Sequence, residues 1–418
     1  MRNLNFSGCA LSICVAAVML AACGGSQPPI GAPGEMTQPS RVHPAYRVVH
    51  SFGGSGDGMS PVAGLINING TLYGTTAYGG GAGSCNTSGY SGCGTVFKIT
   101  PSGKETVLHS FGAPGDGMNP VAGLINVNGT LYGTTANGGA SGVGTVFEIK
   151  KSGKETVLHS FAGTSARDGA DPFAGLLNVG GTLYGTTIGG GGDFGTVFAI
   201  TTSGTETVLH SFGAPGDGAE PVASLTSVSG TLYGTTEYGG AYGYGSYGYG
   251  TVFKIKRSGK ETVLHSFPDG SGDGILPLAG LLNVNGTLYG ATSAGGANCG
   301  SSGGCGMVFK ITKSGTETTL YGFKGDKFGS NDGYYPDAGL VNVNGTLYGT
   351  TRAGGATGNG TVFAITKSGV ETVVHSFKGG SEGGIASDAG LVEVDGTLYG
   401  TTEAGGALGD GIVFSLTP

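Results

Sequence analysis

The sequence predicts an all-β protein, a seven-bladed β-propeller with four-stranded blades, and three observations support this prediction. A hexapeptide, Thr-Leu-Tyr-Gly-Thr-Thr, recurs with a period of about fifty residues. Each copy lies in a unit that has the same order of four short β-type segments. The two ends of the chain supply complementary parts of one unit. The copies begin at Thr71, Thr130, Thr182, Thr231, Thr287, Thr346 and Thr397, and Ala291 replaces one threonine of the fifth copy.

The second copy shows the four segments of a unit. Residues 122–129 lead through an Asn-Gly pair, a strong hairpin signal, into residues 130–135. A glycine-rich loop follows, then residues 144–150, and a Ser-Gly pair turns the chain into residues 155–161. The segments are rich in Val, Ile, Thr, Phe and Tyr and are bounded by turn residues, as strands are. Such a repeated meander is typical of propeller blades, and a β-helix is the alternative fold.

The ends of the chain predict how the ring closes. Residues 46–52 match the fourth segment of a unit, and residues 411–417 match the third. We therefore expect residues 389–417 to supply three strands of the last blade and residues 46–52 to supply its outermost strand. Ladder hydrogen bonds between the two ends would then leave no open repeat end.

The first 45 residues have a different character. Arg2 precedes an apolar run that ends in Leu-Ala-Ala-Cys at Cys23, which has the shape of a secretory signal and resembles the lipobox of bacterial lipoproteins. This predicts a signal peptide over residues 1–22, a lipidated Cys23 within a Pro/Gly-rich tether over 23–45, and the propeller over 46–418. The alternative is an ordinary signal peptide. Gly24 favours the outer membrane by the usual sorting pattern.

Composition restricts the partners. Only 11% of residues are charged, the formal net charge is -7, and no cluster of lysine or arginine is visible along the chain. This argues against nucleic acid and against a basic membrane-docking face, so the predicted membrane contact is the lipid anchor alone. We expect a monomeric body without a cofactor.

The cysteines of the body form two local pairs in glycine- and serine-rich loops. Cys85 and Cys93 lie in one repeat, and Cys299 and Cys305 lie at the same place in another. In an exported protein this predicts two disulfides. A shared four-cysteine metal site is the alternative, and it would require loops from distant repeats to converge.

Alternation of strand direction predicts which side of the ring is variable. The short Asn-Gly and Ser-Gly hairpins fall on one side, and the long second-to-third loops and blade crossings fall on the other. Loops on a rigid scaffold are where binding residues concentrate. The alternative is that these loops only cover blade edges. The predicted ligand-face residues are Tyr78, Ile188, Phe194, Glu237, Tyr238, Tyr242, Tyr334, Tyr335, Arg352 and Glu403.

Residues that recur in nearly every unit are predicted to be structural. A histidine occupies one slot of the fourth segment, with Tyr321 in one copy, and an Asp-Gly pair begins most crossings. We expect outer-strand packing or hydrogen bonding for the first and an Asx-type turn for the second. A calcium ion on the Asp-Gly loops is left open, no metal site is predicted, and no catalytic residue is assigned. Glu237 and Glu403 are expected to lie too far apart for a glycosidase pair.

The unit GTVFKIT-x-SG-x-ETVLHSF…DG…P-x-AGL-x-NVNGTLYGTT resembles the choice-of-anchor tandem-repeat family called GloVer over residues 46–417. The resemblance implies an exported, surface-attached repeat protein. A weaker likeness, in the turn that follows Ile99, is to streptogramin-lyase-type propellers. The function predicted first is a surface-anchored lipoprotein whose propeller binds a glycan or a protein. The alternatives are a structural or adhesive envelope protein and a lyase-like or hydrolytic propeller enzyme.

Overall fold

The structure, a computed structural model, describes residues 45–81, 85, 91–243, 248–268, 272–296, 299, 304–325, 331–383 and 389–418. The chain divides into two compact units, residues 1–42 and 43–418. Cys23 and the predicted signal peptide lie outside the described residues. Among the residues that are described, no helix is long and apolar enough to cross a membrane.

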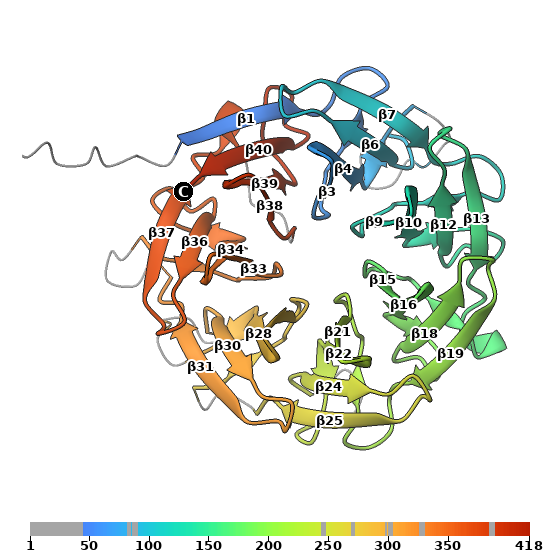
Figure 1. Cartoon of the computed structure of the whole chain (residues 1–418), viewed down its shortest axis with the longest axis vertical. Coiled ribbons are helices and arrows are strands. Elements are labelled where there is room, and N and C mark those ends of the chain that lie inside the picture. The colour runs from blue at the N-terminus through green and yellow to red at the C-terminus, as the bar shows by residue number, and fades with distance from the viewer. Residues whose placement is uncertain are drawn as a thin grey trace, which may run out of the picture. The chain divides into compact units, whose positions relative to one another are not determined.

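Residues 45–418 form a ring of seven four-stranded antiparallel sheets, so the predicted propeller is confirmed (Figure 1). The strands of blades 1 to 3 are β3 (Ile66–Ile68), β4 (Thr71–Thr76), β6 (Thr95–Ile99) and β7 (Glu105–Ser110); β9 (Ile125–Val127), β10 (Thr130–Thr135), β12 (Thr145–Ile149) and β13 (Glu155–Ser160); and β15 (Leu177–Val179), β16 (Thr182–Thr187), β18 (Thr196–Thr201) and β19 (Glu206–Ser211). The strands of blades 4 and 5 are β21 (Thr226–Val228), β22 (Thr231–Thr236), β24 (Thr251–Ile255) and β25 (Glu261–Ser266); and β27 (Leu282–Val284), β28 (Thr287–Thr292), β30 (Met307–Ile311) and β31 (Glu317–Gly322). The strands of blades 6 and 7 are β33 (Val341–Val343), β34 (Thr346–Thr351), β36 (Thr361–Ile365) and β37 (Glu371–Ser376); and β38 (Val392–Val394), β39 (Thr397–Thr402), β40 (Ile412–Thr417) and β1 (Ala45–Ser51).

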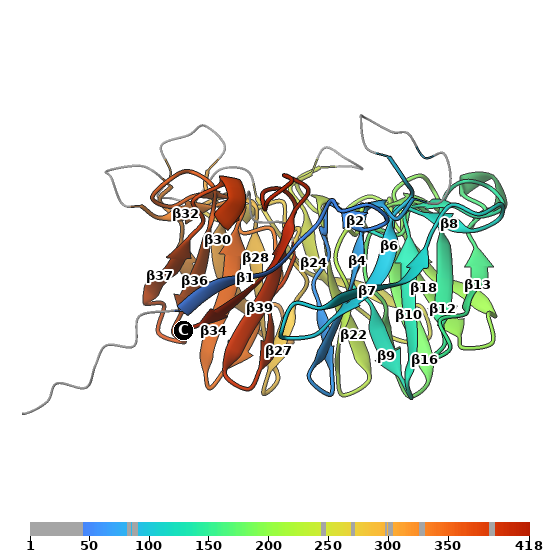
Figure 2. The same ribbon diagram turned by 90° about the horizontal axis from the view of Figure 1, so that it is seen from above.

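The two sides of the ring differ as the hairpin lengths predict (Figure 2). We call the side with the first-to-second and third-to-fourth hairpins the hairpin side, and the opposite side the loop side. On the loop side, a two-residue strand in the crossing pairs with a two-residue strand in the second-to-third loop. These short ladders were not predicted from the sequence. These are β2 (Gly58–Met59) with β5 (Tyr78–Gly79), β8 (Gly117–Met118) with β11 (Asn137–Gly138), β14 (Gly169–Ala170) with β17 (Gly189–Gly190), β20 (Gly218–Ala219) with β23 (Tyr238–Gly239), β26 (Gly274–Ile275) with β29 (Ala294–Gly295), and β32 (Gly333–Tyr334) with β35 (Ala353–Gly354). The 3-10 helices η1 (Thr164–Ala166) and η4 (Gly380–Glu382) lie in crossings on the same side.

The recurring hexapeptide is the second strand of each blade. Its residues contact the next blade, the third strand of the same blade and a buried phenylalanine ring. In blade 1 the first threonine of its Thr-Thr pair, Thr75, donates a hydrogen bond to the carbonyl oxygen of Ala122 in the next blade, at 3.0 Å. The second, Thr76, bonds to the hydroxyl of Thr95 in the third strand, at 2.8 Å. A Cβ on Gly74 would lie only 2.7 Å from Phe97, so this position must remain glycine for the phenylalanine ring to fit. The hexapeptide is therefore structural.

A phenylalanine pair joins every two neighbouring blades. The phenylalanine that follows each outer strand packs edge to face on a phenylalanine in the third strand of the next blade, with ring centroids 5.1 Å apart for Phe111 and Phe147. The other pairs are Phe52–Phe97, Phe161–Phe198, Phe212–Phe253, Phe267–Phe309, Phe323–Phe363 and Phe377–Phe414. These rings are almost entirely buried, so the core of the protein lies between blades.

The N-terminal strand closes the ring as predicted. β1 pairs antiparallel with β40, from Ala45 opposite Thr417 to Ser51 opposite Ile412. Tyr46 lies opposite Leu416, the register that a glutamate occupies in the other blades, for example Glu105 opposite Ile99. The ring of Tyr46 stacks on the ring of His375 in blade 6, with the two ring centroids 4.0 Å apart. The Tyr46 hydroxyl donates a hydrogen bond to the carbonyl oxygen of Glu382 at 2.7 Å.

Tyr46 should therefore contribute to ring closure through its stacked ring more than through its hydroxyl. We expect Tyr46→Ala to lower the free energy of unfolding by about 3 kcal/mol, because it removes a large, mostly buried side chain. Tyr46→Phe keeps the stack and loses one hydrogen bond, so it should cost about 1 kcal/mol or less. Urea unfolding of both variants measures the difference, and equal losses would contradict the role given to the stack.

Candidate functional site

A central cavity of about 800 Å³ runs along the axis of the ring. Its wall is built from the Ala-Gly-Leu segments that precede the innermost strands, such as Ala63, Gly64 and Leu65 in blade 1. Neighbouring segments touch through backbone, since a Cβ on Gly64 would lie 3.3 Å from the carbonyl oxygen of Gly390. The wall combines backbone with mostly aliphatic side chains and is nearly the same in every blade.

The loop end of the cavity is where the blades differ. Residues from two repeat positions reach it: the residue after the second strand, and the residue after the crossing proline that precedes blades 1 to 6. Ile188, Glu237 and Glu403 come from the first position, and Phe173 and Asp337 come from the second. The corresponding residues of blades 1 and 2 are small or aliphatic: Ala77 and Ala136 at the first position, and Val62 and Val121 at the second.

The crossings hold these residues in place through a left-handed residue before the proline. Glu220 has φ 57°, its N–H donates to the carbonyl oxygen of Phe194 in the preceding blade, and its carbonyl oxygen accepts from the N–H of Glu237. Tyr335 has φ 60° and makes the same two bonds, to Cys305 and from Arg352. Each such residue thus fixes the end of a second strand to the blade before it.

Glu237 is a carboxylate of the cavity lining with a shifted pKa. Its burial raises the pKa of its carboxyl, a neighbouring Glu220 adds to this effect, and a hydrogen bond from the Tyr238 hydroxyl opposes it. The same hydrogen bond and burial raise the pKa of Tyr238 to about 12. Across the ring, the guanidinium of Arg352 lies 3.5 Å from the buried carboxylate of Asp337 and 5.9 Å from the ring centre of Tyr335.

The structure brings together only some of the predicted ligand-face residues. Ile188, Glu237 and Glu403 border the cavity, and Tyr335 and Arg352 adjoin its lining residue Asp337. The remaining predicted residues lie farther out, in the short ladders or among the loops: Tyr78 and Tyr238 in β5 and β23, Tyr334 in β32 against the core between blades 5 and 6, Phe194 in the core between blades 3 and 4, and Tyr242 exposed.

Phe173 and Asp337 were missed by the sequence-based prediction. They occupy the position after the crossing proline, which holds Val or Leu in blades 1, 2, 4 and 5. Their departure from the aliphatic residues of the other blades was a signal in the sequence. It was overlooked because the crossing looked like an ordinary turn. Phe173 is 42% exposed, an unusual fraction for a phenylalanine, and it lies at the rim of the cavity.

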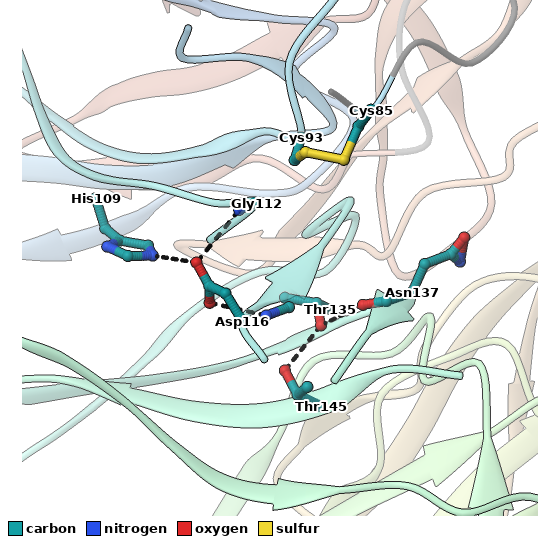
Figure 3. A network of polar contacts seen from close by, with 9 residues as sticks. Cys85, Cys93, His109, Gly112, Asp116, Thr135, Asn137 and Thr145 are labelled. Carbon is teal, nitrogen blue, oxygen red and sulfur yellow. Dashed lines mark hydrogen bonds and ion pairs between the residues drawn. A yellow bond between two sulfur atoms is a disulfide. The ribbon is translucent and has the colours of Figure 1, made fainter. Parts of the chain in front are cut away.

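The two predicted disulfides are present. Cys85 bonds to Cys93, and Cys299 bonds to Cys305. Each bridge closes a short segment of a second-to-third loop on the loop side, in blades 1 and 5. Figure 3 shows the first bridge beside the polar contacts of the crossing between blades 1 and 2.

The recurring histidines and aspartates pair with each other. His109 Nε2 lies 3.0 Å from Asp116 Oδ2, and the other carboxylate oxygen of Asp116 accepts from the N–H of Gly117 at 2.8 Å (Figure 3). Where tyrosine replaces histidine, the Tyr321 hydroxyl donates to Asp332 at 2.9 Å. The carboxylate binds the N–H of the next residue and not the N–H two residues on that an Asx-type turn requires, and the histidine or tyrosine holds the aspartate to the outer strand. The equivalent pairs are His50–Asp57, His159–Asp168, His210–Asp217 and His265–Asp273.

A glutamate from the next blade completes each cluster. Glu155 begins the outer strand of blade 2, and burial, with the nearby Asp116 carboxylate, raises its pKa to about 7. One carboxylate oxygen is buried without a hydrogen-bond partner. The donor atoms of His109, Asp116 and Glu155 lie within 4.8 Å, a spacing that would also suit a cation. In one cluster the phenol of Tyr321 takes the place of the histidine and donates a hydrogen bond to the aspartate. The aspartate can therefore be held in this cluster by hydrogen bonds without a bound cation. The other glutamates are Glu105, Glu206, Glu261, Glu317 and Glu371, with the same pKa.

The fold and the cavity define a tandem-repeat β-propeller with a variable loop side. The model of the Gloeobacter/Verrucomicrobia repeat matches residues 82–299 and 241–418, and the chain belongs to this repeat family. The resemblance seen in the sequence is thereby confirmed. A search of the curated proteins found no matching sequence.

Several solved structures are similar at low identity. PorZ, a surface component of the type-IX secretion system of Porphyromonas gingivalis, is 13% identical with a TM-score of 0.49 over 86% of this chain and 46% of its own. A puromycin-hydrolysing peptidase of Mycobacterium tuberculosis is 12% identical with a TM-score of 0.47 over 81% of this chain and 49% of its own. A gluconolactonase of Xanthomonas campestris is 13% identical with a TM-score of 0.37 over 69% of this chain and 82% of its own. These likenesses are confined to the fold.

The glutamate clusters predict a stability that falls as pH rises. A carboxyl whose pKa is raised from 4.5 to about 7 in the folded protein contributes stability that is fully present below pH 4.5 and is lost as pH rises through 7. After allowance for solvent around a half-buried group, this amounts to on the order of 1 kcal/mol per glutamate.

Glu155→Gln should therefore stabilise the protein at pH 8.5 by on the order of 1 kcal/mol and change little at pH 5, because glutamine resembles the protonated acid. Urea unfolding at the two pH values measures this, and Glu206→Gln in the next interface is the replicate. A gain of the same size at both pH values would contradict the assignment.

Proposed function

We propose that this chain is an exported lipoprotein of the bacterial envelope whose propeller binds a ligand at the loop end of the central cavity. The observation that carries the proposal is the convergence of non-repeated residues there. Seven nearly identical blades place Ile188, Glu237, Glu403, Phe173 and Asp337 at one end of one cavity. The phenylalanine pairs between blades are built from the same residue type in every blade, so they do not require the variation seen at these positions.

Among glycan and protein ligands, the lining favours a segment of a protein. The wall consists mainly of Ala, Val and Leu side chains, and an exposed phenylalanine lies at the rim. Apolar side chains of a peptide bury well against such a wall, whereas a sugar needs many hydrogen-bond partners. The carboxylates of Glu237 and Glu403 at the same end favour a segment that also carries lysine or arginine.

The proposed location in the bacterial envelope is based on the sequence. Leu-Ala-Ala-Cys at Cys23 follows an apolar run, and a proline-rich tether separates it from the ring. The two disulfides are consistent with an oxidising compartment.

A hydrolytic function is the second candidate, and one observation favours it. Glu237 borders the cavity with a raised carboxyl pKa, which is a property of general acids. Glu237→Gln distinguishes the candidates. It should leave peptide binding within a few fold if the site only binds, and it should abolish turnover if the site is hydrolytic.

Binding at the cavity predicts a difference between two matched substitutions. Phe173→Asp places a charge at the rim, whereas Val370→Asp places the same charge on an exposed valine in a hairpin of the opposite side. On peptide and glycan arrays we expect Phe173→Asp to weaken binding at least tenfold, as the loss of a central anchor does, and Val370→Asp to leave it unchanged. Silence of the wild-type protein on both arrays, or equal effects of the two changes, would refute the proposal.

The anchor predicts fatty-acid labelling that depends on Cys23. Cells that express the full chain should incorporate labelled palmitate into it, and Cys23→Ala should abolish the label, because the cysteine sulfur is the acceptor. Cys85→Ala is the control, since it removes a cysteine of the body. Label that persists in Cys23→Ala would show that the chain is not anchored at this residue.

A further inference from the structure

The lysine and arginine side chains gather on the hairpin side of the ring. They lie near the ends of the third strands, in the third-to-fourth hairpins and at the start of β1. The exposed ones are Arg47, Lys104, Lys150, Lys151, Lys154, Lys256, Arg257, Lys260, Lys313 and Lys367, and Lys98, Lys254 and Lys310 are half-buried. In the linear sequence these residues are spread over six repeats, so no cluster of cations is visible along the chain.

The loop side has the opposite charge. Its cations within the described residues are Arg167, Lys324, Arg352 and Lys378. Apart from the aspartates that pair with the recurring histidines or tyrosine in the blade interfaces, its described carboxylates are Asp171, Asp193, Glu220, Glu237, Asp337, Glu382, Glu403 and Asp410. The net charge of -7 therefore hides a strong separation of charge between the two sides.

Few carboxylates offset the cations on the hairpin side. Glu148 is buried and pairs with Lys150 at 3.3 Å, and Glu393 and Asp395 lie in one hairpin of blade 7. The glutamates that begin the outer strands point into the interfaces between blades, beside the aspartates of the preceding crossings. The first-to-second hairpins of blades 1 to 6 carry no charge at their tips.

The first strand of the ring begins on the hairpin side. β1 begins at Ala45, opposite Thr417 at the end of β40, where third strands reach the hairpins. The guanidinium of Arg47 donates to the carbonyl oxygen of Pro101 in the hairpin of blade 1, at 2.5 Å.

We propose that the hairpin side of the propeller rests on an anionic phospholipid surface. Two observations point to this partner: the complementary charge of the exposed lysines and arginines, and the start of β1 on the same side. Phospholipid headgroups attract clustered cations outside the bilayer, and a lipid chain together with a basic surface holds a protein more firmly than either alone. The loop side, with its cavity and carboxylates, then faces away from the membrane and toward its ligand.

This inference rests on the proposed envelope location, but its test does not depend on lipidation. The ring closes within residues 45–418, and its hydrophobic cores lie wholly inside that range, so residues 43–418 can be studied alone. This body should co-sediment with vesicles of equal parts phosphatidylglycerol and phosphatidylethanolamine at low salt. It should not co-sediment with phosphatidylcholine vesicles, and about 0.5 M salt should release it, since screening shortens the reach of the charges.

Two double substitutions with the same change of net charge complete the test. Lys151→Gln with Lys154→Gln removes two cations of the hairpin side, and Arg167→Gln with Lys378→Gln removes two of the loop side. At roughly fivefold per cation, the first pair should weaken vesicle binding about twentyfold, and the second should weaken it less than threefold. Unchanged thermal unfolding shows that both variants are folded.

Three results would overturn the inference: no binding of the body to anionic vesicles at low salt, equal weakening by the two double variants, or binding to heparin or DNA without binding to vesicles. A wild-type full chain that takes up no labelled palmitate, or a Cys23→Ala variant that keeps the label, would instead count against the proposed anchor. The two proposals can therefore fail separately.

Discussion

The edge-to-face phenylalanine pair between neighbouring blades is the interaction on which the ring depends. Each pair places the ring that follows one outer strand against a third-strand ring of the next blade, as with Phe111 and Phe147. No blade can bury its own phenylalanine, so every blade needs two neighbours, and the last interface requires the chain to close on itself. The glycine of the hexapeptide makes room for the ring, and the first threonine of its Thr-Thr pair adds a hydrogen bond to the next blade. The repeat is conspicuous in the sequence because the same interface must be built seven times.

A second, polar layer of contacts surrounds these aromatic pairs. Histidine, aspartate and a glutamate of the following blade meet at successive interfaces, and the glutamate stays partly protonated near neutral pH because burial and the aspartate disfavour its charge. The interface between blade 6 and blade 7, the blade that holds both chain ends, is different. There Tyr46 occupies the glutamate position and stacks on His375, whose pKa burial lowers to about 4. A neutral aromatic pair at this interface avoids the repulsion between carboxylates found elsewhere in the ring.

The blade interfaces restrict most positions of the repeat to a few residue types. The positions that can vary lie mainly on the loop side. Hairpins of fixed length set the blade register, whereas crossings and second-to-third loops vary in length and composition. The cavity wall is made of backbone and small side chains, so its chemistry is decided at the loop end by Phe173, Ile188, Glu237, Asp337 and Glu403. Charge is divided between the same two sides. The proposed ligand and the proposed membrane contact are consequently assigned to opposite sides of one rigid body.

The sequence by itself determined the fold class, the number of blades, the closing strand and the disulfide pairs, because each follows from a local pattern or from a complement between the two ends. Only the tertiary structure decided which variable residues share a site. Phe173 and Asp337 follow prolines in what look like ordinary turns, and they reach the cavity because the crossings wrap inward. Phe194 lies in a variable loop, yet it packs into the core between two blades. The cation-rich side was invisible for the same reason: residues about fifty positions apart become neighbours only when the ring closes.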